Sequence, residues 1–387
     1  MNKLSKVIYI SHSGDLQGAG IALVNIITGI ISSGKYIPIV IMPHEGQLSN
    51  VLNKIGVKYY VIPYYNETLP FIEFSRQYIN YIPKIIRCLL FNFLAKKKLI
   101  EIVKKECPAI IHTNTGVIHI GYRVAKKLKV PHIWHLREIQ GKSTRYYPLF
   151  GLKKFKEELE DKNFCISISK AVKNFYDIDT PNEVVYDGVF SSQTFKEPTL
   201  SKQAQSYFLY VGGLQKSKGF YDAIEAFKIV AKDNDSCELW LAGIDNVDFN
   251  KVICSNPYKN RIKYLGIRHD IMQLMANSKA VLVLGYDEGF GFTLVESVLS
   301  KTIAIARNQA GLKEQMDNAK IALGIDIALR INNNLELANS MKAVLSEDYK
   351  LADREIAFQY VYENYSLENS SCRLVNIYKR VLTYAYT

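Results

Sequence analysis

The stretch AVLVLGYDEGFGFTLVE, residues 280–296, contains a short apolar strand, a glycine-bearing loop and the start of a helix near Phe292. The first N–H groups of a helix are unpaired and carry a partial positive charge, so they favour a bound diphosphate. Gly291 lets the backbone approach such a ligand closely. We expect Glu288 in the loop to face a sugar and Glu296 in the helix to accept hydrogen bonds from a ribose diol. The stretch therefore predicts a nucleotide-sugar site at the end of a strand.

Similar strands, separated by amphipathic helical stretches, occur on both sides of this segment, and the pattern starts twice. The first series comprises residues 6–10, 37–42, 57–62, 109–113, 131–135 and 164–169, and the second begins in 206–219 and continues with 238–243, 262–266, 280–285 and 302–307. The sequence therefore predicts an α/β protein with two Rossmann-like, doubly wound domains that face each other across a cleft. The expected boundaries are 1–188 for the first domain, 189–205 for a polar linker and 206–365 for the second domain.

The composition is typical of a globular chain, because 48% of the 387 residues are hydrophobic and 22% are charged. The six cysteines are scattered without a CxxC pair, which argues against a zinc site or a disulfide framework and favours reduced thiols in the cytosol. The apolar run 7–10 is too short for a secretory signal, and the apolar stretch 85–95 is too short for a membrane span. We therefore expect a cytoplasmic protein, either soluble or peripheral on the inner face of the plasma membrane.

The formal net charge of +12 favours partners such as nucleic acid, anionic lipid or phosphorylated ligands. The sequence has no zinc-finger spacing, no RNA-recognition signature and no compact basic run beyond 96–98, so nucleic acid is not the expected partner. The stretch 71–105 is rich in Phe, Tyr, Ile and Lys, and Pro83 is expected to divide it into two helices. These helices either lie in an anionic membrane interface or pack into the first domain, and the composition fits both.

The pair Glu288 and Glu296, spaced E-x7-E after a strand, resembles the signature of the family 4 glycosyltransferases, and the resemblance covers nearly the whole chain. The other matching segments are YVGGLQKSKGFYDAIEAF (210–227), RNQAGLKEQM (307–316), IHTNTG (111–116), PHIWHLRE (131–138), ISISKAVKNFY (166–176) and VVYDGV (184–189). The resemblance implies the GT-B fold and transfer of a sugar from a nucleotide-sugar with retention at the anomeric carbon. It also implies that the last helix, 366–387, returns to complete the first domain.

The resemblance implies roles for individual residues. Lys218 would bind and stabilise the departing diphosphate, and His135 would orient the donor sugar from the first domain. Asn308 lies in a segment similar to the family's later glycine-containing turn and is expected to contact the donor. Gly18 and Gly20, within LQGAG, would let the first helix approach the donor phosphate or the acceptor. The alternative for these glycines is a plain turn between strand and helix.

Two positions depart from the family pattern. Gly213 stands where the family often has arginine, so one phosphate-binding cation is either missing or supplied by Lys216. Asp187 stands where the family usually has asparagine. Arg137 and Glu138 are either donor contacts or members of a salt-bridged loop.

We expect no metal and no other cofactor. The D-x-D triplets 177–179 and 233–235 lie in turn-like contexts, where aspartate is common without a metal. The expected acceptor is a saccharide or a lipid-linked saccharide in cell-surface polysaccharide synthesis. Two alternatives remain open: a non-hydrolysing sugar-nucleotide epimerase of the same fold, and a nucleic-acid-binding protein that uses the basic charge.

Overall fold

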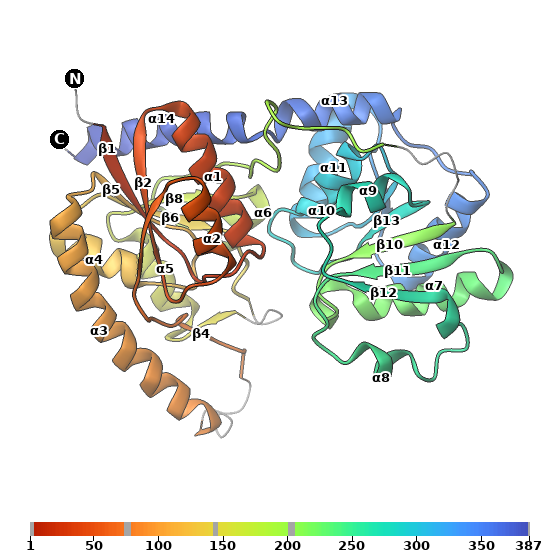
Figure 1. The fold of residues 1–387 in the computed structure, drawn as a ribbon, viewed down its shortest axis with the longest axis horizontal. Coiled ribbons are helices and arrows are strands. Elements are labelled where there is room, and N and C mark those ends of the chain that lie inside the picture. Colours follow the sequence, from red (N-terminus) through yellow and green to blue (C-terminus); the bar gives the residue numbers. More distant parts are fainter. Residues whose placement is uncertain (1–3, 73–78, 142–145, 200–205, 386–387) are drawn as a thin grey trace. The chain divides into compact units, whose positions relative to one another are not determined.

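The computed structural model describes residues 4–72, 79–141, 146–199 and 206–385. The chain divides into two compact units: the first contains residues 1–192 and 366–387, and the second contains residues 193–365 (Figure 1). The chain thus leaves the first unit within a polar segment and returns to it at Ser366.

Within the described residues of the first unit, seven parallel strands form one sheet in the order β3-β2-β1-β5-β6-β8-β9. The strands are β1 (Ser5–Ile10), β2 (Tyr36–Met42), β3 (Lys58–Val61), β5 (Ile110–Thr113), β6 (His132–Leu136), β8 (Phe164–Ser167) and β9 (Asn182–Val184). The helices are α1 (Ala19–Ser33), α2 (Gln47–Lys54), α3 (Ile82–Glu106), α4 (Ile120–Leu128), α5 (Gly151–Glu160), α6 (Lys170–Tyr176) and α14 (Leu367–Ala385). A short antiparallel pair, β4 (Thr68–Leu69) and β7 (Tyr147–Pro148), is not indicated by the sequence pattern.

Helices cover both faces of this sheet, because successive side chains of a strand point to opposite faces. Val7 and Tyr9 of β1 pack against α1, α2 and α14, whereas Ile8 and Ile10 pack against α3 and α4. The first unit is therefore doubly wound, as the alternation of strands and helices predicts.

The last helix completes the core of the first unit. α14 lies along α1, and the two backbones come so close that a Cβ on Gly29 would be 2.5 Å from Ser371 Oγ. Tyr378 of α14 is fully buried, and its hydroxyl lies 3.0 Å from the hydroxyl of Tyr9. The first unit therefore depends on residues from both ends of the chain.

The interpretation of residues 71–105 as two helices is corrected in part. Pro83 lies in the first turn of α3 and does not interrupt a helix. A proline is tolerated there because the first N–H groups of a helix have no partner within the helix. A helix before Pro83 would fall largely on residues 73–78, which lie outside the described residues.

Within the described part of the second unit, six parallel strands form a sheet in the order β12-β11-β10-β13-β14-β15. The strands are β10 (Tyr207–Val211), β11 (Glu238–Ala242), β12 (Ile262–Gly266), β13 (Ala280–Val283), β14 (Ala304–Arg307) and β15 (Leu329–Ile331). The helices are α7 (Phe220–Asp233), α8 (Phe249–Ile253), α9 (Ile271–Ala276), α10 (Phe292–Leu299), α11 (Ala310–Leu323), α12 (Asn334–Leu345) and α13 (Arg354–Asn364). Phe208 and Tyr210 face α7 and α12, whereas Tyr207 and Leu209 face α10 and α11.

The second unit is therefore also Rossmann-like. Every strand expected from the sequence is present in the two sheets, and the edge strands β9 and β15 are additions. All six cysteines lie within the described residues and are free thiols. In the described part of the chain, no helix has the length and apolarity needed to cross a membrane.

Candidate active site

The glycine loop after β10 brings Lys218 to the carboxyl edge of the second sheet. Lys218 ends a single 3₁₀ turn, and Gly219 follows it with a φ of 74°. A Cβ on Gly219 would lie 2.4 Å from the Cβ of Leu284, so only glycine allows this loop to pack against the end of β13. The close approach of the two loops therefore determines where the Lys218 ammonium is held.

Lys218 and Glu288 form an ion pair. Lys218 Nζ lies 2.5 Å from Glu288 Oε1, and the two side chains are 40% and 23% exposed. The backbone of the loop supports this arrangement, because Tyr286 N–H donates to Ser217 O at 2.9 Å and Gly311 N–H donates to Glu288 O at 2.8 Å. The loops that follow the neighbouring strands β10, β13 and β14 thus meet at one edge, where ligands bind in such sheets.

Helix α10 begins beside this ion pair. Its N-cap is Gly291, which has a φ of 98° and no side chain to cap the helix. A Cβ on Gly291 would lie 2.3 Å from Leu312 Cδ2, so the packing of α11 also requires glycine here. The N–H groups of Phe292 and Thr293 donate no hydrogen bond to another described residue. This helix start therefore offers the backbone donors and partial positive charge that suit a phosphate.

Glu296 lies on α10 and is half-buried. Burial raises the pKa of its carboxyl group to about 7, because an ionised carboxylate is poorly solvated there. Its carboxylate makes no hydrogen bond or ion pair with any residue in the described ranges. The oxygens of Glu296 are therefore available to a ligand with hydroxyl groups.

The remaining cationic candidate in this loop is Lys216. It is exposed in the same 3₁₀ turn as Lys218, and no ion pair links it to a described residue. Gly213 lies in the preceding part of the loop, and a Cβ there would lie 3.0 Å from Asn246 Nδ2, the mobile end of a side chain. A side chain at Gly213 is thus sterically tolerated, and Lys216 remains free to supply a charge.

Asn308 lies in a cavity apart from the Lys218–Glu288 pair. It lines a cavity of about 470 Å³ together with Asp222, Tyr286, Arg307, Gln309, Ile331, Asn332, Asn333 and Asn334. Asn308 Oδ1 accepts a hydrogen bond of 3.2 Å from Arg330 Nη1. No contact among the described residues links the Asn308 side chain to Lys218 or Glu288.

Arg307 is a residue of this cavity that sequence reasoning missed. Its guanidinium pairs with Asp222 at 2.5 Å, donates to Leu284 O at 2.9 Å and lies 3.8 Å from the ring centre of Tyr286. Because an arginine at a strand end is common, nothing in the sequence distinguishes Arg307 from other surface cations. Its contacts hold the loop after β13 against β14, next to the Lys218 loop.

In the first unit, Gly18 and Gly20 form the turn between β1 and α1. Gly18 is the N-cap of α1 with a φ of 39°, and a Cβ on Gly20 would lie 2.3 Å from Asp15 O. The tight turn accounts for both glycines without a ligand.

His135 ends β6 and is buried. Its Nδ1 lies 3.1 Å from His112 Nε2, and His112 Nδ1 lies 2.6 Å from the hydroxyl of Tyr378 on α14. Burial, together with the nearby charge of Arg137, holds the pKa of His135 well below its usual range, so the imidazole is neutral. The other nitrogen, His135 Nε2, has no hydrogen-bond partner among the described residues.

Arg137 forms a buried ion pair with Asp187. Arg137 Nη1 lies 2.7 Å from each carboxylate oxygen, and the two side chains are only 5% and 3% exposed. Arg137 Nε also donates to Asn114 O at 3.0 Å. This pairing gives a physical reason for an acid at position 187. The neighbouring Glu138 is half-buried, and desolvation of its carboxyl group raises its pKa to about 7.

Two doubly wound units, with a lysine–glutamate pair beside a glycine-capped helix in the second, give the chain the GT-B fold. Comparison with protein families agrees: residues 191–358 match the model of the family described as glycosyl transferases group 1. The match confirms the predicted resemblance to the family 4 enzymes, and the chain is a glycosyltransferase with a group 1 domain.

Similar proteins include an enzyme and two solved structures. N-acetyl-α-D-glucosaminyl L-malate synthase of Bacillus anthracis is 22% identical over 336 residues, which are 82% of this chain and 86% of that protein. HepE of Anabaena, solved in complex with UDP-glucose, has a TM-score of 0.76 and 16% identity over 97% of this chain and all of that one. A glycosyltransferase from Rickettsia africae has a TM-score of 0.73 and 19% identity over 99% of both chains. The two structures have the GT-B fold in common with this chain.

Proposed function

We propose that the protein transfers a sugar from a nucleotide-sugar to a saccharide or lipid-linked saccharide, with retention at the anomeric carbon, in cell-surface polysaccharide synthesis. The observation that carries the proposal is the Lys218–Glu288 pair of 2.5 Å beside the uncapped start of α10. One cation, one helix start and two glutamates match the parts of a nucleotide-sugar: diphosphate, sugar and ribose. The solved complex of the Anabaena protein with UDP-glucose supports a donor of this class.

In this proposal each donor part has a partner in the second unit. The diphosphate binds Lys218 and the N–H groups at the start of α10, Glu288 binds sugar hydroxyls, and Glu296 binds the ribose diol. As the bond between the anomeric carbon and the phosphate oxygen breaks, its electron pair stays on the diphosphate. The acceptor oxygen then bonds to the anomeric carbon, and its proton passes to the phosphate oxygen that has left. Lys218 counters the charge that collects on the leaving group.

Two further roles stay predictions. His135 is expected to hydrogen-bond the donor sugar, and its neutral imidazole with an unpaired Nε2 is suited to that role. We also propose that transfer needs no metal ion, because Lys218 and the helix start supply the positive charge. The described residues contain no group of three or more His, Cys, Asp or Glu side chains placed to hold a metal.

The proposal is tested with a panel of UDP-, GDP- and ADP-sugars, measured by thermal unfolding in EDTA and then by transfer assays. A donor at a hundred times its dissociation constant should stabilise the protein by about 2.7 kcal/mol. If no nucleotide-sugar stabilises the protein, the proposed donor class is wrong. If EDTA abolishes activity and only Mn²⁺ restores it, the proposal that transfer needs no metal ion is wrong. Turnover without an acceptor would identify the epimerase alternative. Steeply salt-dependent binding to DNA or RNA would favour the nucleic-acid alternative.

Replacing Glu296 by glutamine should weaken donor binding through the ribose. Losing hydrogen bonds to a charged group costs about 1.5–3 kcal/mol, or roughly ten- to a hundredfold in affinity. Because the wild-type pKa is about 7 and the ionised carboxylate accepts both ribose hydroxyls, donor affinity should rise as pH increases through 7. Calorimetric titration of the nucleotide-sugar at pH 6 and pH 8 measures this.

The matched control for this prediction is Glu225→Gln, which removes an exposed carboxylate on α7 in the same unit. The nucleotide-sugar is the right probe because its diphosphate is esterified at both ends and does not titrate near pH 7. The variant Glu296→Gln should lose the pH dependence along with the affinity. Equal affinity of wild type and Glu296→Gln at both pH values would show that Glu296 is an ordinary helix residue.

We further propose that the first unit binds an anionic membrane surface through α3. Six apolar side chains in the first half of this helix are between 42% and 61% exposed: Ile82, Ile86, Leu89, Leu90, Phe93 and Leu94. Residues 82–100 contain five lysines and arginines and no acidic residue. An apolar stripe flanked by cations is complementary to lipid chains and anionic headgroups. The location fits a lipid-linked acceptor.

The double variant Leu90→Glu/Phe93→Glu should reduce binding to vesicles of equal parts phosphatidylcholine and phosphatidylglycerol by roughly a hundredfold. Vesicle flotation at low and high salt measures this, and wild-type binding should fall with salt. The control is Ile321→Glu, which adds the same charge at a residue of the second unit that is 84% exposed. If wild type does not bind the vesicles, and the double variant differs from it only in oligomeric state, the apolar stripe is a subunit interface instead.

A further inference from the structure

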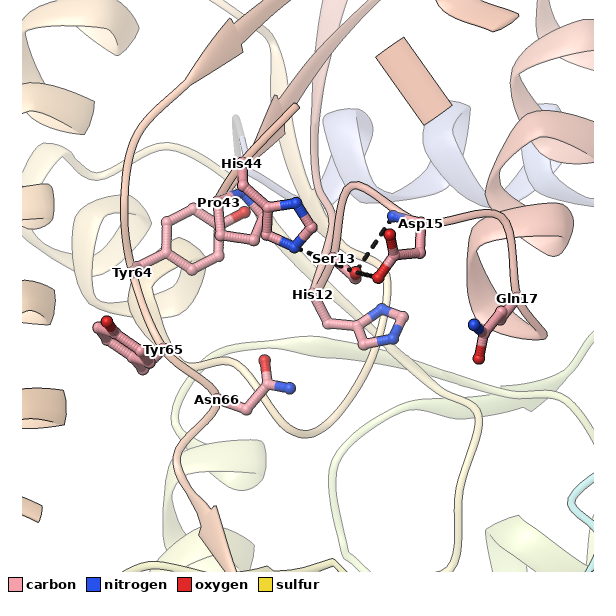
Figure 2. Close-up of a pocket in the computed structure, with 9 residues that line it drawn as sticks. All are labelled: His12, Ser13, Asp15, Gln17, Pro43, His44, Tyr64, Tyr65 and Asn66. Carbon is pink, nitrogen blue, oxygen red and sulfur yellow. Dashed lines mark hydrogen bonds between the residues drawn. The ribbon is translucent and has the colours of Figure 1, made fainter. Parts of the chain in front are cut away.

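A cavity of about 370 Å³ in the first unit takes no part in the donor proposal (Figure 2). Its lining residues come from the loops that follow β1, β2 and β3, three adjacent parallel strands. Ligands of such sheets bind at this edge, and the volume lies within the range of small-molecule sites. The cavity is therefore placed and sized for one small ligand group.

Close backbone packing fixes the loops around the cavity. A Cβ on Gly14 would lie 2.2 Å from His44 O, and a Cβ on Gly46 would lie 2.5 Å from Gly14 O. The loops after β1 and β2 therefore touch without room for larger residues. The polar groups that these loops carry are held in place before any ligand arrives.

A short hydrogen-bond network presents a carboxylate to the cavity (Figure 2). Ser13 Oγ donates to Asp15 Oδ2 at 2.8 Å, and Gly14 N–H donates to His44 Nε2 at 3.4 Å. His44 Nδ1 donates to Glu45 O at 3.0 Å. Because Asp15 is exposed, both of its oxygens can accept hydrogen bonds from a ligand.

Two buried polar atoms of the lining have no partner in the part of the chain that the structure describes. His12 Nδ1 and Asn66 Oδ1 are buried, and neither makes a hydrogen bond with a described residue. Burial, together with the nearby charge of Arg137, lowers the pKa of His12 to about 4, so its imidazole is neutral. Buried polar groups are normally hydrogen-bonded, and an unpaired one destabilises the protein. A ligand with several hydroxyl groups would satisfy both atoms.

The charges of the lining select the chemical class. No lysine or arginine of the described residues lines the cavity, Asp15 is the anionic group among them, and His12 is neutral. An anionic ligand such as a phosphate or a dicarboxylate would meet a carboxylate and no cation. The amides of Gln17 and Asn66 and the ring of Tyr65 are typical partners of sugar hydroxyls and of a pyranose face.

We propose that this cavity is the acceptor subsite and that it binds a neutral sugar residue through Asp15, His12 and Asn66. The inference rests on the proposed glycosyl transfer and adds the class of acceptor: a polyol without charge at the residue that is bound. Asp15 accepts hydrogen bonds from two hydroxyls, and the buried atoms of His12 and Asn66 orient the ring.

The test uses methyl pyranosides of glucose, galactose and N-acetylglucosamine, with malate and inorganic phosphate as anionic probes. Saturation-transfer NMR should show that a neutral glycoside binds wild type and that malate does not. The ³¹P signal of inorganic phosphate, which has no carbon-bound protons, should not broaden when the protein is added. Asp15→Asn should lower the affinity for that glycoside about ten- to a hundredfold. Glu45→Gln, in the neighbouring loop, makes the same charge change outside the cavity. This variant should bind the glycoside with the affinity of wild type.

Donor binding separates the two proposals. Asp15→Asn and Asn66→Ala should bind the nucleotide-sugar as wild type does. Fluorescence of the buried Trp134 in a Trp240→Phe background shows that the first unit of each variant is folded. If no glycoside binds, if both variants bind it like wild type, or if an anion binds in its place, the acceptor inference is wrong. If wild type binds a glycoside but no nucleotide-sugar, the proposed function fails instead.

Discussion

Replacing Lys218 by alanine is expected to lower kcat by about 10²–10³ and to raise the donor KM, because one preorganised electrostatic contact is lost. The diphosphate is already charged in the ground state, so Lys218 contributes to binding. More negative charge collects on it as the glycosidic bond breaks, so Lys218 contributes more to the transition state. Steady-state kinetics with a saturating acceptor measure both constants.

The ion pair with Glu288 requires a control, since Lys218→Ala also leaves that carboxylate without its partner. If the loss came only from the unpaired carboxylate, the double variant Lys218→Ala/Glu288→Gln would have no lower kcat than Glu288→Gln alone. Lys216→Ala should have a milder effect, and Lys216→Ala/Lys218→Ala a larger effect than either single change. A change in KM alone would mean that Lys218 provides uniform binding and no catalysis.

Asp187→Asn is expected to destabilise the first unit by about 3–5 kcal/mol, because it leaves the buried Arg137 guanidinium without its counter-charge. Asparagine has the same shape, so the effect measures charge and not packing. The two tryptophans of the chain, Trp134 and Trp240, lie in different units. In a Trp240→Phe background, urea unfolding followed by fluorescence therefore reports on the buried Trp134 in the first unit alone.

The control is Glu157→Gln, which breaks an exposed pair with Lys154 in the same unit, whose side chains are 50% and 57% exposed. Exposed pairs contribute about 0–1 kcal/mol, so this variant should unfold almost like wild type. The double variant Asp187→Asn/Arg137→Met removes both charges and should recover part of the stability. Equal unfolding free energies for Asp187→Asn and Glu157→Gln would contradict the importance of the buried pair.

The fold was accessible from sequence because its signals are local. A strand such as 280–283 is a run of apolar residues, and the helix that follows begins at a glycine, so both can be read within one short window. The edge strand β15 was missed because its three residues carry no such run. The sequence predicts an interruption at Pro83 because it does not show where the helix begins. A proline in the first turn of a helix cannot then be distinguished from one in the middle.

The site was less accessible because its contacts join distant positions. Arg137 and Asp187 are 50 residues apart, and His112 and Tyr378 are 266 apart. Neither His12 nor His44 belongs to a motif, so the cavity that they line has no signal in one sequence. Lys218 and Glu288 could be proposed as site residues because each lies in a loop next to glycines, and the structure pairs them.

The position of α14 has a consequence for synthesis of the protein. Tyr378 fills the core beneath Tyr9, so the sheet that begins at β1 lacks part of its covering until the last helix has been translated. The second unit, residues 193–365, lies entirely within the interval and has its own core. During translation the second unit can therefore fold before the first, which, although its strands are made earlier, must wait for α14. A chain truncated after residue 366 should resist protease in the second unit and not in the first.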